Sequence, residues 1–195
     1  ALIPTSAHGT NPASASLCGL TIIQIPCVDT GEISIVDLQE TLSKHSDTVA
    51  ALMITYPSTF GTFDKNIKQV TALVHKFGAQ IYMDGANMNA QIGVTSPAAI
   101  NADVCHINLH KTFAIPHGGG GPGVGPICVA KHLVPFLPTP NQNTPEANYF
   151  SSSFYGSASI CLISYGYIKL MGSDGLKKAT QVALLSANFI ANRLS

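Results

Sequence analysis

The sequence predicts an α/β fold, a three-layer sandwich in which helices cover both faces of a mostly parallel sheet. Short apolar segments alternate with longer segments of helical periodicity along most of the 195 residues. The apolar segments are continuous rather than alternating with polar residues, which is typical of strands buried on both faces of a parallel sheet. The length is sufficient for one domain with a substantial core.

Six short apolar segments are predicted as strands. The second is rich in β-branched residues, and several of the others end at polar or turn-forming residues. They span residues 2–6, 21–26, 49–56, 80–83, 104–109 and 127–130. The fourth strand is predicted to end before Asp84, which begins a loop at 84–87.

Five segments are predicted as helices, at 13–20, 37–44, 67–77, 157–171 and 175–194. Asn11 is the expected N-cap of the first, with Pro12 at its first helical position. The third has apolar residues on one side, and Gly78 is expected to end it. The proline-rich segment 133–148 is predicted to be irregular, and the last two helices are expected to join near Gly172.

The composition contains few charges, and this excludes several classes of partner. Charged residues make up 10% of the chain, against roughly 25% in an average soluble domain. We therefore expect much of the surface to be buried, within the chain or against a partner. The net charge is zero, and no apolar run reaches the roughly 18 residues of a membrane span, so neither nucleic acid nor a membrane is an expected partner. The first residues lack the charged start of a signal peptide, and we expect a piece of a larger protein.

The five cysteines are widely spaced, and none forms a C-x-x-C pair. A tetra-cysteine zinc site is therefore not predicted. Because most of the cysteines lie in apolar sequence, we expect buried free thiols in a reducing compartment.

Polar residues follow four of the predicted strands: His8, Ser58, Asp84 and Lys111. Because ligands of open α/β sheets bind at the carboxyl ends of the strands, we expect these four residues to form one site. A lysine there can be partly desolvated, which lowers its pKa and makes its amine a usable nucleophile. The glycines at 118–123 would allow backbone to approach a ligand closely.

These residue types fit a cofactor with a carbonyl group and a basic ring nitrogen, such as pyridoxal phosphate. Lys111 would bind the carbonyl carbon, the Asp84 carboxylate would keep the ring nitrogen protonated, and the His8 ring would stack on the pyridine face. His110 and Thr112 flank the lysine and could contact the phosphate or orient the ring. Each residue also has an ordinary structural explanation: a surface lysine, a turn aspartate, a loop histidine bonded to backbone, or a local hydrogen bond.

Other chemistries are less well supported by the motifs. His106 and His110 are four residues apart, but no H-E-x-x-H pattern accompanies them, so no metal site is predicted. The segment 156–160 lacks the last glycine of a G-x-S-x-G elbow. The glycine run follows the lysine and opens no helix, so it is neither a Walker A nor a dinucleotide motif.

Four motifs carry a family resemblance: residues 7–14 (AHGTNPAS), 55–59 (TYPST), 82–90 (YMDGANMNA), and 108–113 (NLHKTF) followed by 116–123 (PHGGGGPG). They closely resemble the P-protein family of the glycine cleavage system. The likeness extends over essentially the whole chain, including 167–172 and 175–179 in the tail.

The resemblance implies a fold-type-I, aspartate aminotransferase-like enzyme that uses pyridoxal phosphate. Residues 1–150 would belong to its large, cofactor-binding domain, and 151–195 would lead toward a C-terminal small domain. Lys111 would be the Schiff-base lysine, Asp84 the pyridinium partner and His8 the stacking residue, with Ala86 on the opposite ring face. His110, Thr112 and Ser58, with Thr59, would lie near the phosphate or the substrate.

The implied reaction is the decarboxylation of glycine, with transfer of the aminomethyl group to the lipoyl arm of the H-protein. The full enzyme would be a homodimer or a heterotetramer, in the bacterial cytoplasm or the mitochondrial matrix. The family's upstream phosphate-binding segment and its small domain are not among these residues, so we expect the piece alone to bind the cofactor poorly and to have little activity. Phe60 stands where family members often have histidine or asparagine.

Two alternatives stay open. One is another fold-type-I enzyme, such as an aminotransferase, an aldolase or an amino-acid decarboxylase. The other is a non-catalytic fragment or partner subunit that keeps the fold, although the presence of Lys111, Asp84 and His8 argues against loss of catalysis. A metal-binding scaffold is ranked last.

Overall fold

One sheet forms the centre of the computed structural model, which describes residues 1–117, 123–137 and 155–194. Its strand order is β2-β1-β3-β4-β5-β6, and all neighbouring pairs are parallel except β5 and β6. The strands are β1 (Leu2–Pro4), β2 (Ile23–Ile25), β3 (Ala51–Thr55), β4 (Gln80–Gly85), β5 (Val104–Ile107) and β6 (Ile127–Val129). The predicted α/β class with a mostly parallel sheet is confirmed.

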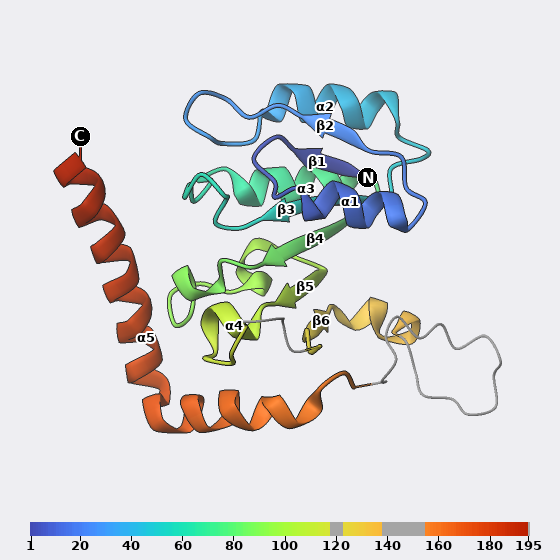
Figure 1. Ribbon diagram of the computed structural model, residues 1–195. Coiled ribbons are helices and arrows are strands. Elements are labelled where there is room, and N and C mark those ends of the chain that lie inside the picture. The colour runs from blue at the N-terminus through green and yellow to red at the C-terminus, as the bar shows by residue number, and fades with distance from the viewer. Residues whose placement is uncertain (118–122, 138–154, 195) are drawn as a thin grey trace, which may run out of the picture.

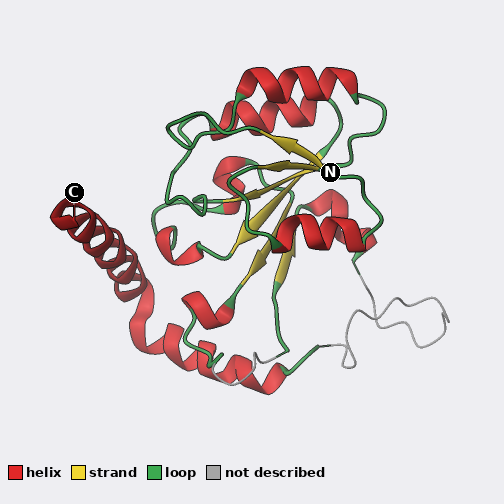
Figure 2. Ribbon diagram, turned by 45° about the horizontal axis from the view of Figure 1, so that its top comes forward, coloured by secondary structure: helices red, strands yellow, loops and turns green. Residues whose placement is uncertain are grey.

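Helices cover both faces of this sheet (Figures 1 and 2). Helix α1 lies on one face, and α2 and α3, which pack on each other, lie on the opposite face. The helices are α1 (Thr10–Leu17), α2 (Ile35–Lys44), α3 (Ile67–Lys76), α4 (Leu109–Thr112) and α5 (Cys161–Leu194), with 3₁₀ turns η1 (Met88–Ala90), η2 (Pro97–Ile100), η3 (Lys131–Phe136) and η4 (Ala158–Ile160). This arrangement is the predicted three-layer sandwich.

The core lies between the sheet and the pair α2 and α3. Strand residues such as Leu52 and Ile81 pack there against helix residues such as Leu38 and Val74, and all four are fully buried. Burial of such side chains is the main source of stability for a sheet covered on both faces. The central strands are thereby held rigidly, and their carboxyl ends are positioned.

Several predicted boundaries are wrong for physical reasons. Helix α1 begins at Thr10 after Gly9, with no side-chain cap, because Asn11 lies inside the helix, where it is buried and donates its amide to Thr55. Strand β4 extends to Gly85, so Asp84 is a strand residue that pairs with His106 in β5. Strand β5 ends at Ile107, and the residues around Lys111 form the short helix α4.

Helix α5 is two helical arms joined at Gly172, as the sequence predicts. Gly172 has φ 61° and ψ −179°, values that are not helical, and Figure 1 shows the chain bending there. The first arm contacts the segment after α4, since Ser164 Oγ donates to the Phe113 carbonyl oxygen over 2.9 Å. In the segment predicted to be irregular, residues up to 136 form η3, and 138–148 lie outside the described residues.

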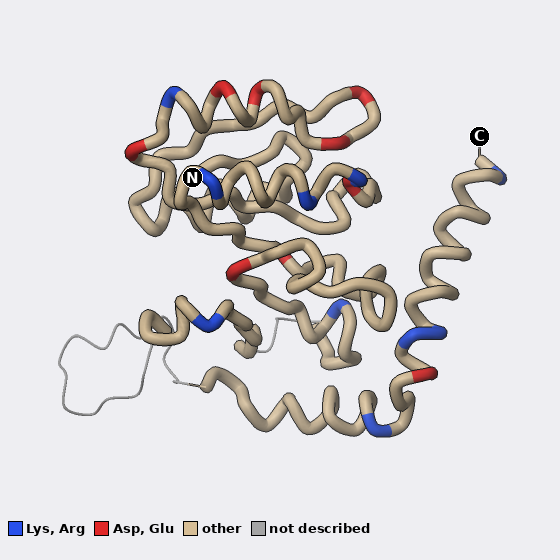
Figure 3. The backbone as a smooth tube through the Cα atoms, turned by 180° about the vertical axis from the view of Figure 1, so that it is seen from behind, with Lys and Arg blue, Asp and Glu red and all other residues tan. Residues whose placement is uncertain are grey.

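The surface is sparsely charged (Figure 3). About half of the charged residues lie on α2, α3 and the nearby loops, and α5 exposes large apolar side chains that include Leu170, Leu185 and Leu194. The free cysteines do not match the prediction of buried thiols: Cys105 is buried, but Cys18 and Cys128 are exposed, because they lie at a helix end and on the edge strand. A search of the described helices found none with the length and hydropathy that a membrane crossing requires.

Candidate active site

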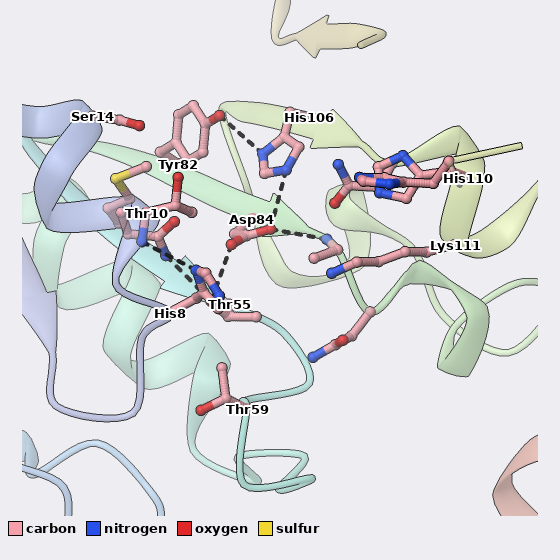
Figure 4. Close-up of a pocket in the computed structure, with 16 residues that line it drawn as sticks. His8, Thr10, Ser14, Thr55, Thr59, Tyr82, Asp84, His106, His110 and Lys111 are labelled. Atoms are coloured by element: carbon pink, nitrogen blue, oxygen red, sulfur yellow. Dashed lines mark hydrogen bonds and ion pairs between the residues drawn. The ribbon is translucent and has the colours of Figure 1, made fainter. Parts of the chain in front are cut away.

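A cavity of about 740 Å³ opens at the carboxyl ends of the strands. Residues that follow β1, β3, β4 and β5 contribute to its lining, as the parallel topology predicts. Figure 4 shows His8, Asp84 and Lys111 converging on this space. Three of the four predicted strand-end residues therefore meet in one cavity.

Asp84 is the buried acid of the cavity, with only 1% of its surface exposed. Its Oδ1 accepts a hydrogen bond from the Ala86 N–H over 2.9 Å and lies 3.2 Å from His106 Nε2. Its Oδ2 accepts from Thr55 Oγ1 over 3.4 Å, and Thr55 in turn accepts from the Asn11 amide. A buried carboxylate needs such donors because it can only accept hydrogen bonds.

His106 is the residue of the cavity lining, in contact with Asp84, that the sequence reasoning missed. Its Nδ1 lies 3.0 Å from the Tyr82 hydroxyl, and its Nε2 faces Asp84, so the three side chains form a chain across β4 and β5 (Figure 4). Burial, followed by the charge of Asp84, raises the pKa of Tyr82 to about 12. The available signal was a polar residue inside an apolar strand, but its meaning depends on the pairing of His106 with Asp84 across two strands.

Lys111 lies in α4, at the mouth of the cavity, with its side chain exposed. Its Nζ forms no hydrogen bond or ion pair with any residue that the structure describes. Among the described residues, α4 holds this lysine at the rim of the cavity rather than in its floor. The lysine also borders a second cavity, of about 120 Å³, shared with Thr112 and the second arm of α5.

His8, Ala86 and His110 also line the main cavity. His8 is exposed, and its Nδ1 accepts from the Thr10 N–H over 3.1 Å, the backbone bond that the sequence left open as an alternative. The His110 ring meets the His117 ring edge-on, with centroids 4.5 Å apart. Desolvation, with the charges of His117 and Lys111 next, lowers the pKa of His110.

Ser58 and Thr112 do not line the main cavity. Ser58 Oγ accepts from the N–H groups of Phe60 and Thr62, which places this residue in the turn after β3. The Thr112 hydroxyl oxygen is buried without a hydrogen-bond partner among the described residues and faces the smaller cavity. Thr59, in contrast, lines the main cavity and donates to the Ser6 carbonyl.

Other predicted features have different outcomes. Phe60 is 64% exposed on the surface. Residues 118–122 of the glycine run lie outside the described part of the chain. Within that part, no group of three or more histidine, cysteine or acidic side chains is arranged to hold a metal ion.

Taken together, the cavity offers a primary amine and a buried carboxylate, which suit a ligand with an aldehyde and a basic ring nitrogen.

Solved structures resemble this fold at low sequence identity. Mouse CSAD in its apo form superposes with a TM-score of 0.75 and 15% identity, over 98% of this chain and 43% of that one. The SepCysS–SepCysE N-terminal domain complex gives a TM-score of 0.69 and 14% identity, over 92% of this chain and 48% of that one. Oryza sativa TDC with PLP and tryptamine gives a TM-score of 0.68 and 14% identity, over 91% of this chain and 40% of that one. At these identities the likeness shows the fold alone.

Curated relatives are far more similar in sequence. Glycine dehydrogenase (decarboxylating) of Christiangramia forsetii is 57% identical over 100% of this chain, and that of Brucella canis is 58% identical over 99%. The mitochondrial glycine dehydrogenase (decarboxylating) of Dictyostelium discoideum is 55% identical over 99%. This chain spans only about a fifth of the length of these relatives.

The family model described as "Glycine cleavage system P-protein" matches residues 21–139, which is more than half of the chain. That range contains Asp84, His106 and Lys111, the central residues of the cavity. The sequence resemblance is thereby confirmed, and the chain belongs to the glycine cleavage system P-protein family.

Proposed function

We propose that the full protein containing this chain decarboxylates glycine with the help of pyridoxal phosphate. The observation that carries this proposal is the meeting of Lys111 and Asp84 in one cavity of a P-protein family chain. The curated relatives are named glycine dehydrogenase (decarboxylating), which supports the same reaction class.

The residues of the cavity fit this cofactor. Its volume of about 740 Å³ lies in the usual range for small-molecule sites. Lys111 has an amine without a partner among the described residues, and Asp84 is buried among donors that favour a carboxylate. The Oryza sativa TDC structure, which has the same fold, contains PLP, and this is consistent with the assignment.

Each residue has a distinct role in the proposal. When bound, the cofactor supplies an electron sink for the pair of electrons left by loss of carbon dioxide. Lys111 would hold the cofactor through its aldehyde group. Asp84 would keep a proton at the ring nitrogen, and His8 and Ala86, which line the same cavity, would lie against the two faces of the ring. His110 would contact the ligand from the lining of the main cavity, Ser58 would support the turn after β3, and Thr112 would lie beside Lys111 in the lining of the small cavity.

The proposed partners follow from the family. Glycine is the substrate, and the lipoyl arm of the H-protein receives the aminomethyl group. The full enzyme would assemble as a homodimer or a heterotetramer, with residues 1–150 in its cofactor-binding domain and 151–195 leading to a small domain. The free thiols suit a reducing compartment, the bacterial cytoplasm or the mitochondrial matrix.

The test is covalent attachment of the cofactor to the full-length protein. Pyridoxal phosphate is added, the visible absorbance band is recorded, borohydride is used to fix the cofactor, and the labelled peptide is identified by mass spectrometry. We expect the label on Lys111, no label in Lys111→Ala, and normal labelling in the control Lys65→Ala, whose lysine pairs with Glu32 on the surface. A label on another lysine, or no band at all, would overturn the cofactor assignment.

A further inference from the structure

We infer that Tyr82 and His106 act as a positioning pair for Asp84, holding an Nε2–H of His106 against the carboxylate so that it stays charged and aligned for the cofactor's ring nitrogen. The inference rests on the proposed function. It assigns a role to two residues that are neither the nucleophile nor the carboxylate.

The geometry of the pair is set by the sheet. Asp84 and His106 are directly paired in the register of β4 and β5, and Tyr82 lies two residues before Asp84 on the same strand. Side chains two residues apart on a strand project from the same face, so all three lie on the cavity side. The distances are 3.0 Å from the Tyr82 hydroxyl to His106 Nδ1 and 3.2 Å from His106 Nε2 to Asp84 Oδ1.

The direction of the hydrogen bonds follows from the chemistry of the groups. With its pKa raised to about 12 by burial, Tyr82 keeps its hydroxyl proton at neutral pH and can donate to His106 Nδ1. A neutral imidazole that accepts at Nδ1 carries its hydrogen on Nε2, facing Asp84. A protonated imidazole also carries a hydrogen on Nε2, so Asp84 receives a donor in either state.

Asp84 can accept a further hydrogen bond at Oδ2. Oδ1 accepts from Ala86 and faces His106, while Oδ2 has a single, long hydrogen bond from Thr55 at 3.4 Å. A carboxylate oxygen can accept more than one donor, so Oδ2 retains a lone pair for the protonated ring nitrogen. The His106 side chain is 22% exposed, which leaves it in contact with the cavity yet partly shielded from water. The pair therefore fixes one oxygen and leaves the other for the ligand.

The test compares pyridoxal phosphate with 1-deazapyridoxal phosphate, in which a C–H replaces the ring nitrogen. Dissociation constants of both are measured on the full-length protein, so only an effect that acts through the ring nitrogen changes their ratio. We expect the wild type to prefer pyridoxal phosphate by about 10- to 100-fold, the range of a hydrogen bond to a charged group.

Four variants separate positioning from packing. His106→Leu and Tyr82→Phe should reduce the preference by about tenfold, within the range for a lost hydrogen bond to a charged group. His106→Gln keeps a side-chain N–H donor and should recover part of the preference. The control Tyr56→Phe removes a buried hydroxyl that donates to the Asp64 carbonyl in the loop between β3 and α3, and it should leave the ratio unchanged.

The outcomes distinguish the two hypotheses. If the wild type binds both compounds equally, Asp84 does not serve a ring nitrogen, and the proposed function fails together with the inference. If the wild type shows the preference but His106→Leu and Tyr82→Phe weaken both compounds equally, the pair is only structural, and the inference alone is overturned. A lowered ratio with partial recovery in His106→Gln supports it.

Discussion

Two buried aspartates, Asp84 and Asp103, lie at opposite ends of adjacent strands of the sheet. Asp84 is near the carboxyl end of β4 and faces the cavity, whereas Asp103 directly precedes β5. The Asp103 carboxylate accepts from the Ile81 N–H over 2.7 Å and lies 2.7 Å from His75 Nε2. Because active sites of parallel sheets lie at the carboxyl ends, similar burial leads to different roles.

Asp84→Asn should lower glycine-dependent activity by about 100-fold or more, the order seen when a site loses one well-placed charged or polar group. The shape is kept, and the amide oxygen can still accept from Ala86, so the melting temperature should change little. Exchange of labelled carbon dioxide into glycine, with H-protein present, measures the loss. Activity near that of the wild type would remove Asp84 from the mechanism.

Asp103→Asn is the matched variant with the opposite expected result. It weakens the contact with His75 and should cost about 1–3 kcal/mol of stability, as for a hydrogen bond to a charged group. Its activity at low temperature should match the wild type, and thermal unfolding should begin earlier. If Asp103→Asn lowered activity without loss of stability, the two ends of the strands would not have the separate roles that we expect.

Individual site residues were predictable to different degrees. His8, Asp84 and Lys111 each follow their own apolar segment, so strand-end reasoning was enough to bring them together. His106 was not predictable, because its role depends on which residue it faces across the sheet, and no local pattern specifies the register of β4 and β5. The exposure of Lys111 was also unpredictable, since one helical turn at α4 decides it.

At the scale of elements, Gly85 allows β4 and β5 to approach closely beside the site. A Cβ at this position would clash with the His106 carbonyl oxygen and lie 3.0 Å from Cys105 Sγ. The backbone of a paired strand cannot move aside without breaking the pairing that aligns Asp84 with His106. Only glycine therefore fits at this position, and a larger residue here would also disturb the pairing of Asp84 with His106.

Gly85→Ala should destabilise the protein by about 1–3 kcal/mol, the usual cost of overpacking, and should also weaken pyridoxal phosphate binding. Gly166→Ala in α5 is the control, because a Cβ there meets nothing within 4 Å and alanine favours helix by about 1 kcal/mol. Melting temperature and cofactor affinity are measured for both. A Gly85→Ala protein with unchanged affinity would show that the site tolerates separation of the strands.

The predictability of elements follows the strength of their local signals. Helix α3 was predicted within one residue of its observed end, because its apolar face is regular and Gly78 follows it. Helix α2 was placed two residues late because its N-cap was overlooked: Ser34 Oγ accepts from the Asp37 N–H. Helix α1 was misplaced because Asn11, a good capping residue, forms a buried tertiary hydrogen bond instead.

At the scale of the whole molecule, the Cys105 thiol and the Tyr82 hydroxyl are expected to make the protein less stable at alkaline pH. Burial is the largest cause that raises the pKa of Cys105 from 9.0 to about 12, and that of Tyr82 from 10.0 to about 12. Well below pH 9 both groups are neutral in the folded and the unfolded chain. As pH rises toward 12, the unfolded chain releases these protons while the folded chain keeps them, so folding is progressively disfavoured.

The melting temperature should therefore fall as pH rises above about 9, even with a reductant present to prevent thiol oxidation. Cys105→Ala should flatten the early part of this decline, and Tyr82→Phe the part that begins near pH 10. Replacement of the exposed Cys18 by alanine is the control and should leave the profile unchanged. Profiles that overlay in all four proteins would show that neither buried group contributes.

The scarcity of charge was a correct signal of an unusual surface, but not of its location. Sequence composition gives a total of ten acidic and ten basic residues, while the structure shows that α5, which carries five of them, also exposes many apolar side chains. Composition is an average over the chain, so it cannot assign a surface to an element. The layered sheet, in contrast, was predictable because alternation of segments is a property of the whole sequence.

The bend at Gly172 also has a mechanical consequence. Ser164, on the first arm of α5, is bonded to the residue two positions after Lys111, and Thr180, on the second arm, borders the small cavity beside Lys111. The two arms of α5 thus approach the turn that carries Lys111 from different directions, and Gly172 is the hinge between them. The torsion angles of Gly172 set the angle between these two arms, although this glycine lies about sixty positions along the chain from Lys111.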